Sequence, residues 1–176
     1  RPMTHDLVIR GGTVADGRGS ALFEADIAVD DGKIAAIGKI YGSGKEEIDA
    51  KGLLVAPGWV DIHSHYDGQA LFEDRLLSSG WHGATTTVMG NCGVGFAPVG
   101  PGQKDLLIEL MEGVEDIPGE VLGEGLGWDW GSFEDFLAAR ERRPHGVDIC
   151  AQLPDSALRV YGMGERAMRR EPATAD

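Results

Sequence analysis

The stretch APGWVDIHSHYDGQ, residues 56–69, decides how the chain folds. Its apolar run ends in His63 and His65, and Tyr66 and Asp67 follow directly. Side chains at i and i+2 of a strand point to the same face, so the run predicts a strand with two imidazoles side by side at its end. Such a pair suits a borderline metal such as zinc, although a lone His-x-His also occurs at the polar end of ordinary strands.

Short strands are predicted before this stretch, in DLVIRGG (6–12), ADIAVDDGKIAAIG (25–38) and GLLVAPG (52–58). Asp31-Gly32 stands between two β-type runs, which indicates a hairpin because a tight primed turn needs positive φ. We therefore expect residues 3–56 to form a small β-sandwich, the N-terminal part of a composite domain.

Strands and helices alternate after this boundary. Strands are predicted in GWVDIHSH (58–65), ATTTVMGNCGVG (84–95) and VDICAQLP (147–154), and helices in DRLLSSGWHG (74–83), GQKDLLIELMEGVED (102–116) and SFEDFLAARERR (132–143). Repeated βα units predict an α/β fold with a parallel sheet. A TIM (β/α)₈ barrel needs roughly 250 residues, so residues 57–176 are expected to be only its first βα units. We expect a truncated chain whose barrel requires a missing C-terminal segment.

Charge and composition restrict the partners. The chain has 29 acidic and 16 basic side chains, a net charge of −13 that argues against nucleic acid and anionic membranes as ligands. It has no apolar run of membrane-spanning length, and its first twenty residues lack the apolar core of a secretory signal. Its two cysteines suit a reducing compartment better than a disulfide framework, so a cytoplasmic location is expected.

Cys92 is the second candidate for chemistry. It follows a predicted strand within VMGNCGVG, residues 88–95, where glycines flank it. Barrel active sites gather at the carboxyl ends of strands, which would bring Cys92 toward His63 and His65. A thiol near a cation ionises readily, so a metal-bound Cys92 is reasonable, and a small buried thiol is the alternative.

The segments APGWVDIHSHYDGQ, WHGATTTVMGNCGVGFAPV and LMEGVEDIPG resemble the N-acyl-D-amino-acid deacylase (D-aminoacylase) family of the metal-dependent amidohydrolase superfamily. The resemblance covers nearly the whole chain. It implies that His63, His65 and Cys92 help to hold Zn²⁺, the cysteine replacing the carboxylated lysine of hydantoinase-like relatives. No lysine follows Lys104, which agrees with the cysteine version.

The resemblance also implies a function. We expect a zinc-dependent hydrolase that splits the acyl amide of N-acyl-D-amino acids into a carboxylate and a D-amino acid. Tyr66 and Asp67 are predicted to shape its substrate pocket. Two further histidine ligands and the general-base aspartate are expected beyond residue 176, so this chain alone is predicted to be an inactive fragment. Asp155 departs from the family, where histidine is frequent.

Two alternatives remain open. The first is a cyclic amide hydrolase similar to hydantoinase or dihydroorotase. The second is a non-catalytic scaffold fragment. The other histidines, His5, His82 and His145, lie outside the matching positions and are predicted to be structural.

Overall fold

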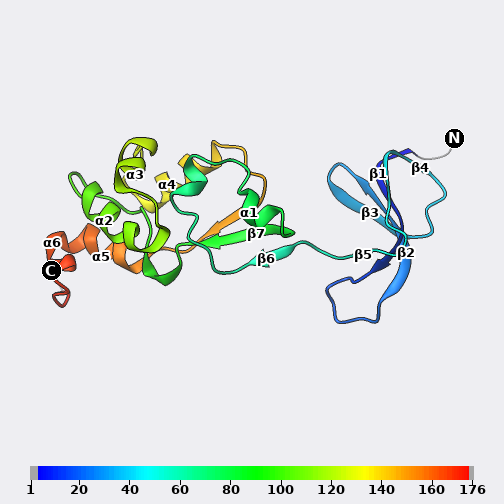
Figure 1. Cartoon of the computed structure of the whole chain (residues 1–176), viewed down its shortest axis with the longest axis horizontal. Coiled ribbons are helices and arrows are strands. Elements are labelled where there is room, and N and C mark those ends of the chain that lie inside the picture. Colours follow the sequence, from blue (N-terminus) through cyan, green and yellow to red (C-terminus); the bar gives the residue numbers. More distant parts are fainter. Residues whose placement is uncertain (1–3, 175–176) are drawn as a thin grey trace. The chain divides into compact units, whose positions relative to one another are not determined.

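The computed structural model describes residues 4–174, and the chain divides between Pro57 and Gly58 into two compact units (Figure 1). The first unit contains five strands: β1 (Thr4–Val14), β2 (Phe23–Asp30), β3 (Lys33–Gly38), β4 (Ser43–Asp49) and β5 (Leu54–Val55). They form one sheet in the order β3-β2-β1-β4, with β5 also paired to β1. Residues 3–56 were expected to form a small β-sandwich, and the single sheet found within residues 4–57 would supply one layer of it.

The hairpin at Asp31-Gly32 is confirmed. It joins the antiparallel strands β2 and β3, and both turn residues have positive φ, 50° and 71°. By contrast, β4 and β5 both run parallel to β1. The small core of this unit includes Val8, Val14 and Ala28.

The second unit is built on three parallel strands, β6 (Trp59–Asp61), β7 (Ala84–Met89) and β8 (Asp148–Ala151), in that order in the sheet. The predicted α/β class, with consecutive parallel strands joined through helices, is confirmed. Thr87 and Met89 of β7 are fully buried, whereas Val60 of β6 is mostly exposed.

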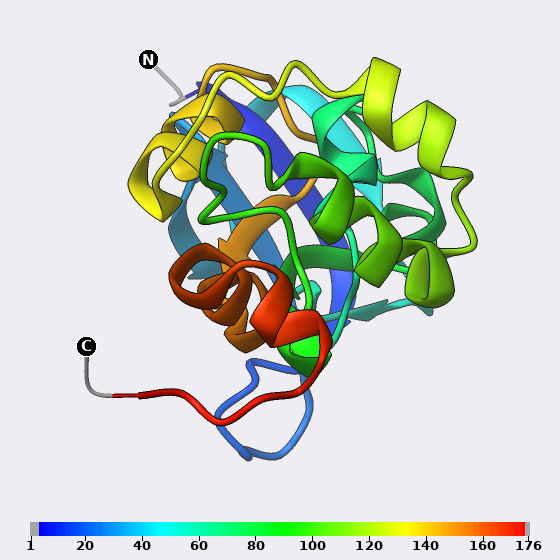
Figure 2. The same ribbon diagram turned by 90° about the vertical axis from the view of Figure 1, so that its left-hand side faces the viewer.

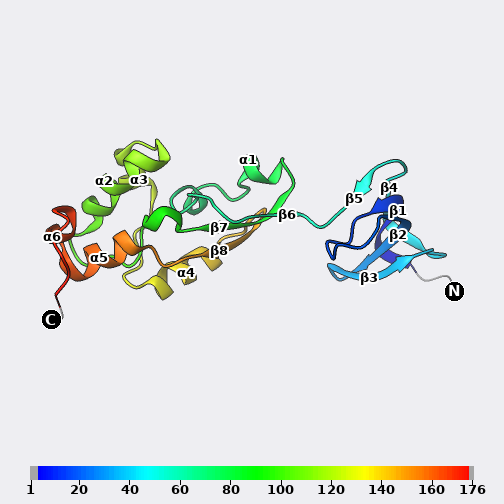
Figure 3. The same ribbon diagram turned by 90° about the horizontal axis from the view of Figure 1, so that it is seen from below.

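Short and long helices connect these strands. They are η1 (Gln69–Leu71), α1 (Leu77–Gly80), η2 (Asn91–Gly93), α2 (Lys104–Glu115), α3 (Gly119–Gly125), α4 (Phe133–Glu141), α5 (Asp155–Met163) and α6 (Glu165–Met168). Figure 3 shows α2, α3, α5 and α6 gathered at one end of the unit, away from α1. In Figure 2, α2 lies beside α3, and α5 runs on into α6. Because β7 and β8 lead directly into η2 and α5, this helical end is the carboxyl end of the sheet.

The main core of the second unit lies among these helices. Phe96, Leu107, Met111, Leu122 and Phe136 are its large buried members. Helix α4 begins with the predicted capping box, in which the Ser132 side chain and Asp135 each accept from the other's backbone N–H. Within residues 4–174, no helix combines the length and apolarity needed to cross a bilayer.

Candidate metal centre

The histidine pair lies just beyond β6. The strand ends at Asp61, four residues earlier than the sequence predicted. The extended course nevertheless continues, because Ser64 N–H donates to Val88 O of β7 at 3.0 Å. Ser64 is buried between the histidines, and the imidazole rings of His63 and His65 lie near each other with centroids 5.5 Å apart.

Cys92 comes to this pair from the segment after β7. It lies in η2 with φ 53° and ψ 15°, a left-handed conformation between two positive-φ glycines, Gly90 and Gly93. Its Sγ lies 3.3 Å from His63 Nε2. One donor atom each from His63, His65 and Cys92 lies within 4.8 Å of the others. The structure thus brings together all three predicted metal residues, although they come from two separate loops.

The donor set fits zinc. Thiolate and imidazole are ligands that zinc takes readily, and donors of one tetrahedral zinc ion lie roughly 3.5 Å apart. His65 Nδ1 is buried and has no hydrogen-bond partner. Burial, with a smaller contribution from neighbouring His63, lowers the pKa of His65. Both effects favour a neutral imidazole with an available lone pair, the form that binds a metal.

A pocket of about 400 Å³ opens beside the histidines. Tyr66 lines it as predicted, and its hydroxyl is held by Ser79 Oγ at 2.7 Å and Ser78 Oγ at 3.1 Å. The other lining residues are Asp61, His63, Ser64, His65, Gln69 and Ile117. Sequence reasoning did not name Ile117, although it lies within LMEGVEDIPG, one of the segments that carry the family resemblance.

Asp67 is placed differently from its predicted position in the pocket wall. It is only 2% exposed, does not line this pocket, and accepts a hydrogen bond from Gly90 N–H at 3.0 Å. Burial raises the pKa of Asp67 to about 6. Its contact is therefore with the turn that carries Cys92.

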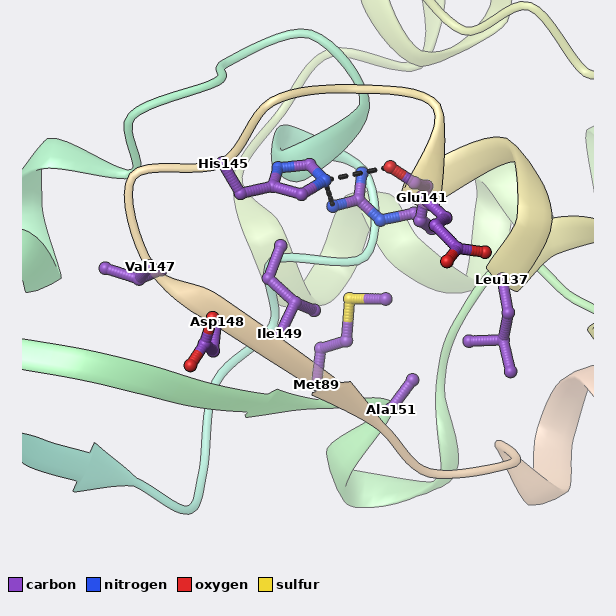
Figure 4. Close-up of a pocket in the computed structure, with 9 residues that line it drawn as sticks. Met89, Leu137, Glu141, His145, Val147, Asp148, Ile149 and Ala151 are labelled. Atoms are coloured by element: carbon purple, nitrogen blue, oxygen red, sulfur yellow. Dashed lines mark hydrogen bonds between the residues drawn. The ribbon is translucent and has the colours of Figure 1, made fainter. Parts of the chain in front are cut away.

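A second pocket, of about 480 Å³, lies between α4 and β8 and shares no lining residue with the first (Figure 4). Its floor includes Met89, Ile149 and Ala151, and its polar rim includes His145. His145 Nε2 lies 2.9 Å from the carbonyl oxygen of Arg140, and the buried guanidinium of Arg140 donates to the carbonyl of Ala70. Arg140 thereby ties α4 to the segment that follows the histidine pair.

The remaining histidines and the second cysteine lie outside the cluster. His5 is buried in the N-terminal unit and pairs with Asp30 through Nδ1 and Oδ2, 2.8 Å apart. His82 is exposed, and Cys150 is an exposed free thiol in β8. Asp155, where the resemblance suggested histidine, begins α5.

Comparison with known proteins agrees with this arrangement. A model of the amidohydrolase family, Amidohydro_3, matches residues 46–176. N-acyl-D-aspartate deacylase from Alcaligenes xylosoxydans xylosoxydans is 33% identical over 165 residues, which are 93% of this chain and 31% of that protein. The chain therefore spans about a third of the length of this relative.

Solved structures give the same result. A crystal structure of D-aminoacylase, described as defining a novel subset of amidohydrolases, matches 98% of this chain and 34% of its own length, with TM-score 0.78 and 32% identity. N-acyl-D-glutamate deacylase from Bordetella bronchiseptica, complexed with zinc and a phosphonate inhibitor, matches 96% of this chain and 35% of its own length. Its TM-score is 0.76 and its identity 30%.

Proposed function

The chain belongs to the amidohydrolase family, and on this premise we propose that it supplies part of the zinc centre of an N-acyl-D-amino-acid deacylase. The observation that carries the proposal is the meeting of His63, His65 and Cys92, whose donor atoms lie within 4.8 Å of one another. Relatives described as N-acyl-D-aspartate and N-acyl-D-glutamate deacylases support the substrate class. The free thiol of Cys92 suits a reducing compartment, so a cytoplasmic location fits the proposal.

The residues of this chain would hold the ion and shape the space next to it. Zinc, when bound, would polarise the amide carbonyl and make water acidic enough to react near neutral pH. His65 presents a neutral imidazole because its surroundings lower its pKa. Tyr66, fixed by two serine hydroxyls, forms a polar wall of the adjoining pocket, and Ile117 adds apolar surface where an acyl group could pack.

The chain alone should bind zinc but turn over little substrate. The family resemblance implies two further histidine ligands beyond these three donors, and no residue of this chain is assigned as the general base. The reaction itself is therefore expected only when the rest of the barrel is present.

The test separates binding from turnover. Zinc per chain is measured for the wild type and for Cys92→Ala after identical stripping and reloading. Turnover is measured with N-acetyl-D-amino acids, their L enantiomers and a hydantoin. A hybrid is used, in which residues 4–174 replace the matching third of the Alcaligenes N-acyl-D-aspartate deacylase.

We expect Cys92→Ala to lose tightly bound zinc and the hybrid to release D-amino acids preferentially. Unchanged zinc in Cys92→Ala would make the cysteine a packing residue and contradict the proposed centre. Preferential opening of the hydantoin would favour a cyclic amide hydrolase, and robust turnover by the 176-residue chain would contradict the division of roles proposed here.

A further inference from the structure

The side chain of Asn91 joins the segments at the carboxyl ends of all three parallel strands. Its Nδ2 donates to the carbonyl oxygen of Val88 in β7 at 2.8 Å, and to that of Ser64, after β6, at 3.2 Å. Its Oδ1 accepts from Gln152 Nε2, after β8, at 3.0 Å. A single amide group therefore adds three side-chain hydrogen bonds between segments that backbone hydrogen bonds from Ser64 and Gln152 to β7 also join.

Cys92, the residue after Asn91, needs such support. Its φ of 53° is uncommon for any residue except glycine, and a strained conformation persists only when surrounding contacts over-determine it. Part of this support acts on Gly90, whose N–H donates to buried Asp67 at 3.0 Å. The Asn91 amide adds further support from the residue immediately before the cysteine.

The histidine segment is held from the same side. Thr87 Oγ1 donates to Ser64 Oγ at 2.7 Å, and Ser64 Oγ donates to Val88 O at 2.9 Å. Thr87 is fully buried and Ser64 nearly so. Since Ser64 stands between His63 and His65, this network and the Asn91 amide act on the same short piece of chain. Asn91 is thus hydrogen-bonded to the histidine segment, and it is the direct neighbour of Cys92 in the chain.

We propose that Asn91 is a positioning residue whose amide holds Cys92 at the distance from His63 that a shared zinc ion requires. The inference rests on the proposed zinc centre and adds to it the group that sets its geometry. Only an amide can donate to two carbonyls and also accept from Gln152. A carboxylate of the same shape would turn both donated hydrogen bonds into contacts between oxygen lone pairs, which repel.

The test uses Asn91→Asp in the 176-residue chain with Co²⁺ as the probe. Affinity is measured by competition with a chromophoric chelator, and Cys92 ligation by thiolate-to-cobalt charge-transfer absorption. We expect affinity to fall about 10- to 100-fold, the usual effect of losing a group that orients a ligand. The negative charge of the new carboxylate would by itself attract Co²⁺ and strengthen its binding. Weaker binding in Asn91→Asp would therefore mean that the metal ligands have moved out of position.

Gln103→Glu is the matched control. It makes the same amide-to-acid change and removes the donor of a 2.8 Å hydrogen bond to Val160 O, in a contact between α5 and the residue before α2. It should leave Co²⁺ affinity unchanged. Gln152→Met serves as a milder second variant if Asn91→Asp does not fold, because it removes only the hydrogen bond to Asn91 Oδ1. It should weaken Co²⁺ binding in the same direction by a smaller factor.

The outcomes separate this inference from the proposed function. Asn91→Asp, or Gln152→Met as its substitute, could bind Co²⁺ with wild-type affinity and an undiminished charge-transfer band. That result would overturn the role of Asn91 without contradicting the zinc centre. A wild-type chain without that band would overturn the zinc centre instead. Amide hydrogen exchange of residues 90–93 then decides the role of Asn91. Faster exchange in Asn91→Asp than in Gln103→Glu supports it, and equal exchange overturns it.

Discussion

Gly90→Ala should destabilise the C-terminal unit strongly, because two separate costs coincide at this position. Gly90 has φ 79°, and a left-handed conformation costs a residue with a Cβ roughly 1–2 kcal/mol. A Cβ built on Gly90 would also lie 2.3 Å from the carbonyl oxygen of Gln152, so the ends of β7 and β8 would have to separate. Overpacking of this kind typically costs about 1–3 kcal/mol. We therefore expect a loss of about 2–5 kcal/mol.

Gly93→Ala isolates the backbone cost, so its difference from Gly90→Ala gives the steric cost. Gly93 has a similar φ of 74°, but its nearest neighbour would be Asp155 Cβ at 3.5 Å, an ordinary contact. Only the backbone cost of roughly 1–2 kcal/mol should remain. The stability of both variants is measured by urea unfolding, followed by tryptophan fluorescence with chelator present. This signal reports on the C-terminal unit, because all four tryptophans lie in it. Equal losses in the two variants would refute the close approach of Gly90 to Gln152.

Three further predictions concern stability of the metal-free chain, each measured by urea unfolding. Ser132→Ala should lower the free energy of unfolding by about 1 kcal/mol, because it removes the helix cap of α4. After reloading, its zinc content should equal that of the wild type. Phe136→Ala should cost about 3–5 kcal/mol, because Phe136 is 1% exposed and its removal leaves a cavity. Asp67 has a pKa of about 6 in the folded chain, against an ordinary value of 3.8. The folded state therefore binds the proton more tightly than the unfolded state, so the free energy of unfolding falls as pH rises from about 4 through 6. Asp67→Asn should abolish this loss of about 3 kcal/mol, and parallel pH profiles of the two proteins would contradict it.

Local signals predicted the fold well where a few neighbouring residues decide the conformation. The hairpin follows from Asp31-Gly32, because positive φ is a property of those two residues. The start of α4 follows from Ser132 and Asp135, whose side chains satisfy backbone groups within one turn. Both features could be assigned before any long-range contact was known.

Elements that depend on distant partners escaped prediction. SGKEEID has no apolar alternation, yet it forms β4 because its backbone pairs with β1, where Ile48 lies opposite Ile9. Helix α5 was missed at the sequence level, because it follows Pro154, which supplies no side-chain cap. It is held because Ala157 and Val160 enter the core shared with α2. The strand predicted through His65 ended at Asp61, which pairs with Thr87, and Ser64 N–H makes one more hydrogen bond to β7 beyond it.

The same division applies to the candidate site. The spacing of His63 and His65 and the glycines around Cys92 made these three residues candidates, and the family resemblance then implied that they hold a metal. The sequence could not reveal what aligns them, because Asn91 acts through carbonyl groups 3 and 27 residues away along the chain. Nor could it show that Asp67 turns away from the pocket, because its contact with Gly90 crosses 23 residues.

The composition of the cluster explains how such an acidic chain could select zinc. A net charge of −13 attracts every cation to the surface, so charge alone gives no preference among them. Hard cations such as Ca²⁺ and Mg²⁺ require oxygen ligands, whereas the cluster found within residues 4–174 offers two imidazoles and a thiol. Asp61, two residues before His63, accepts a hydrogen bond from His63 N–H at 3.1 Å. Selectivity would thus be set by two short loops that exclude carboxylates from the donor set, and by the hydrogen bonds that hold those loops together.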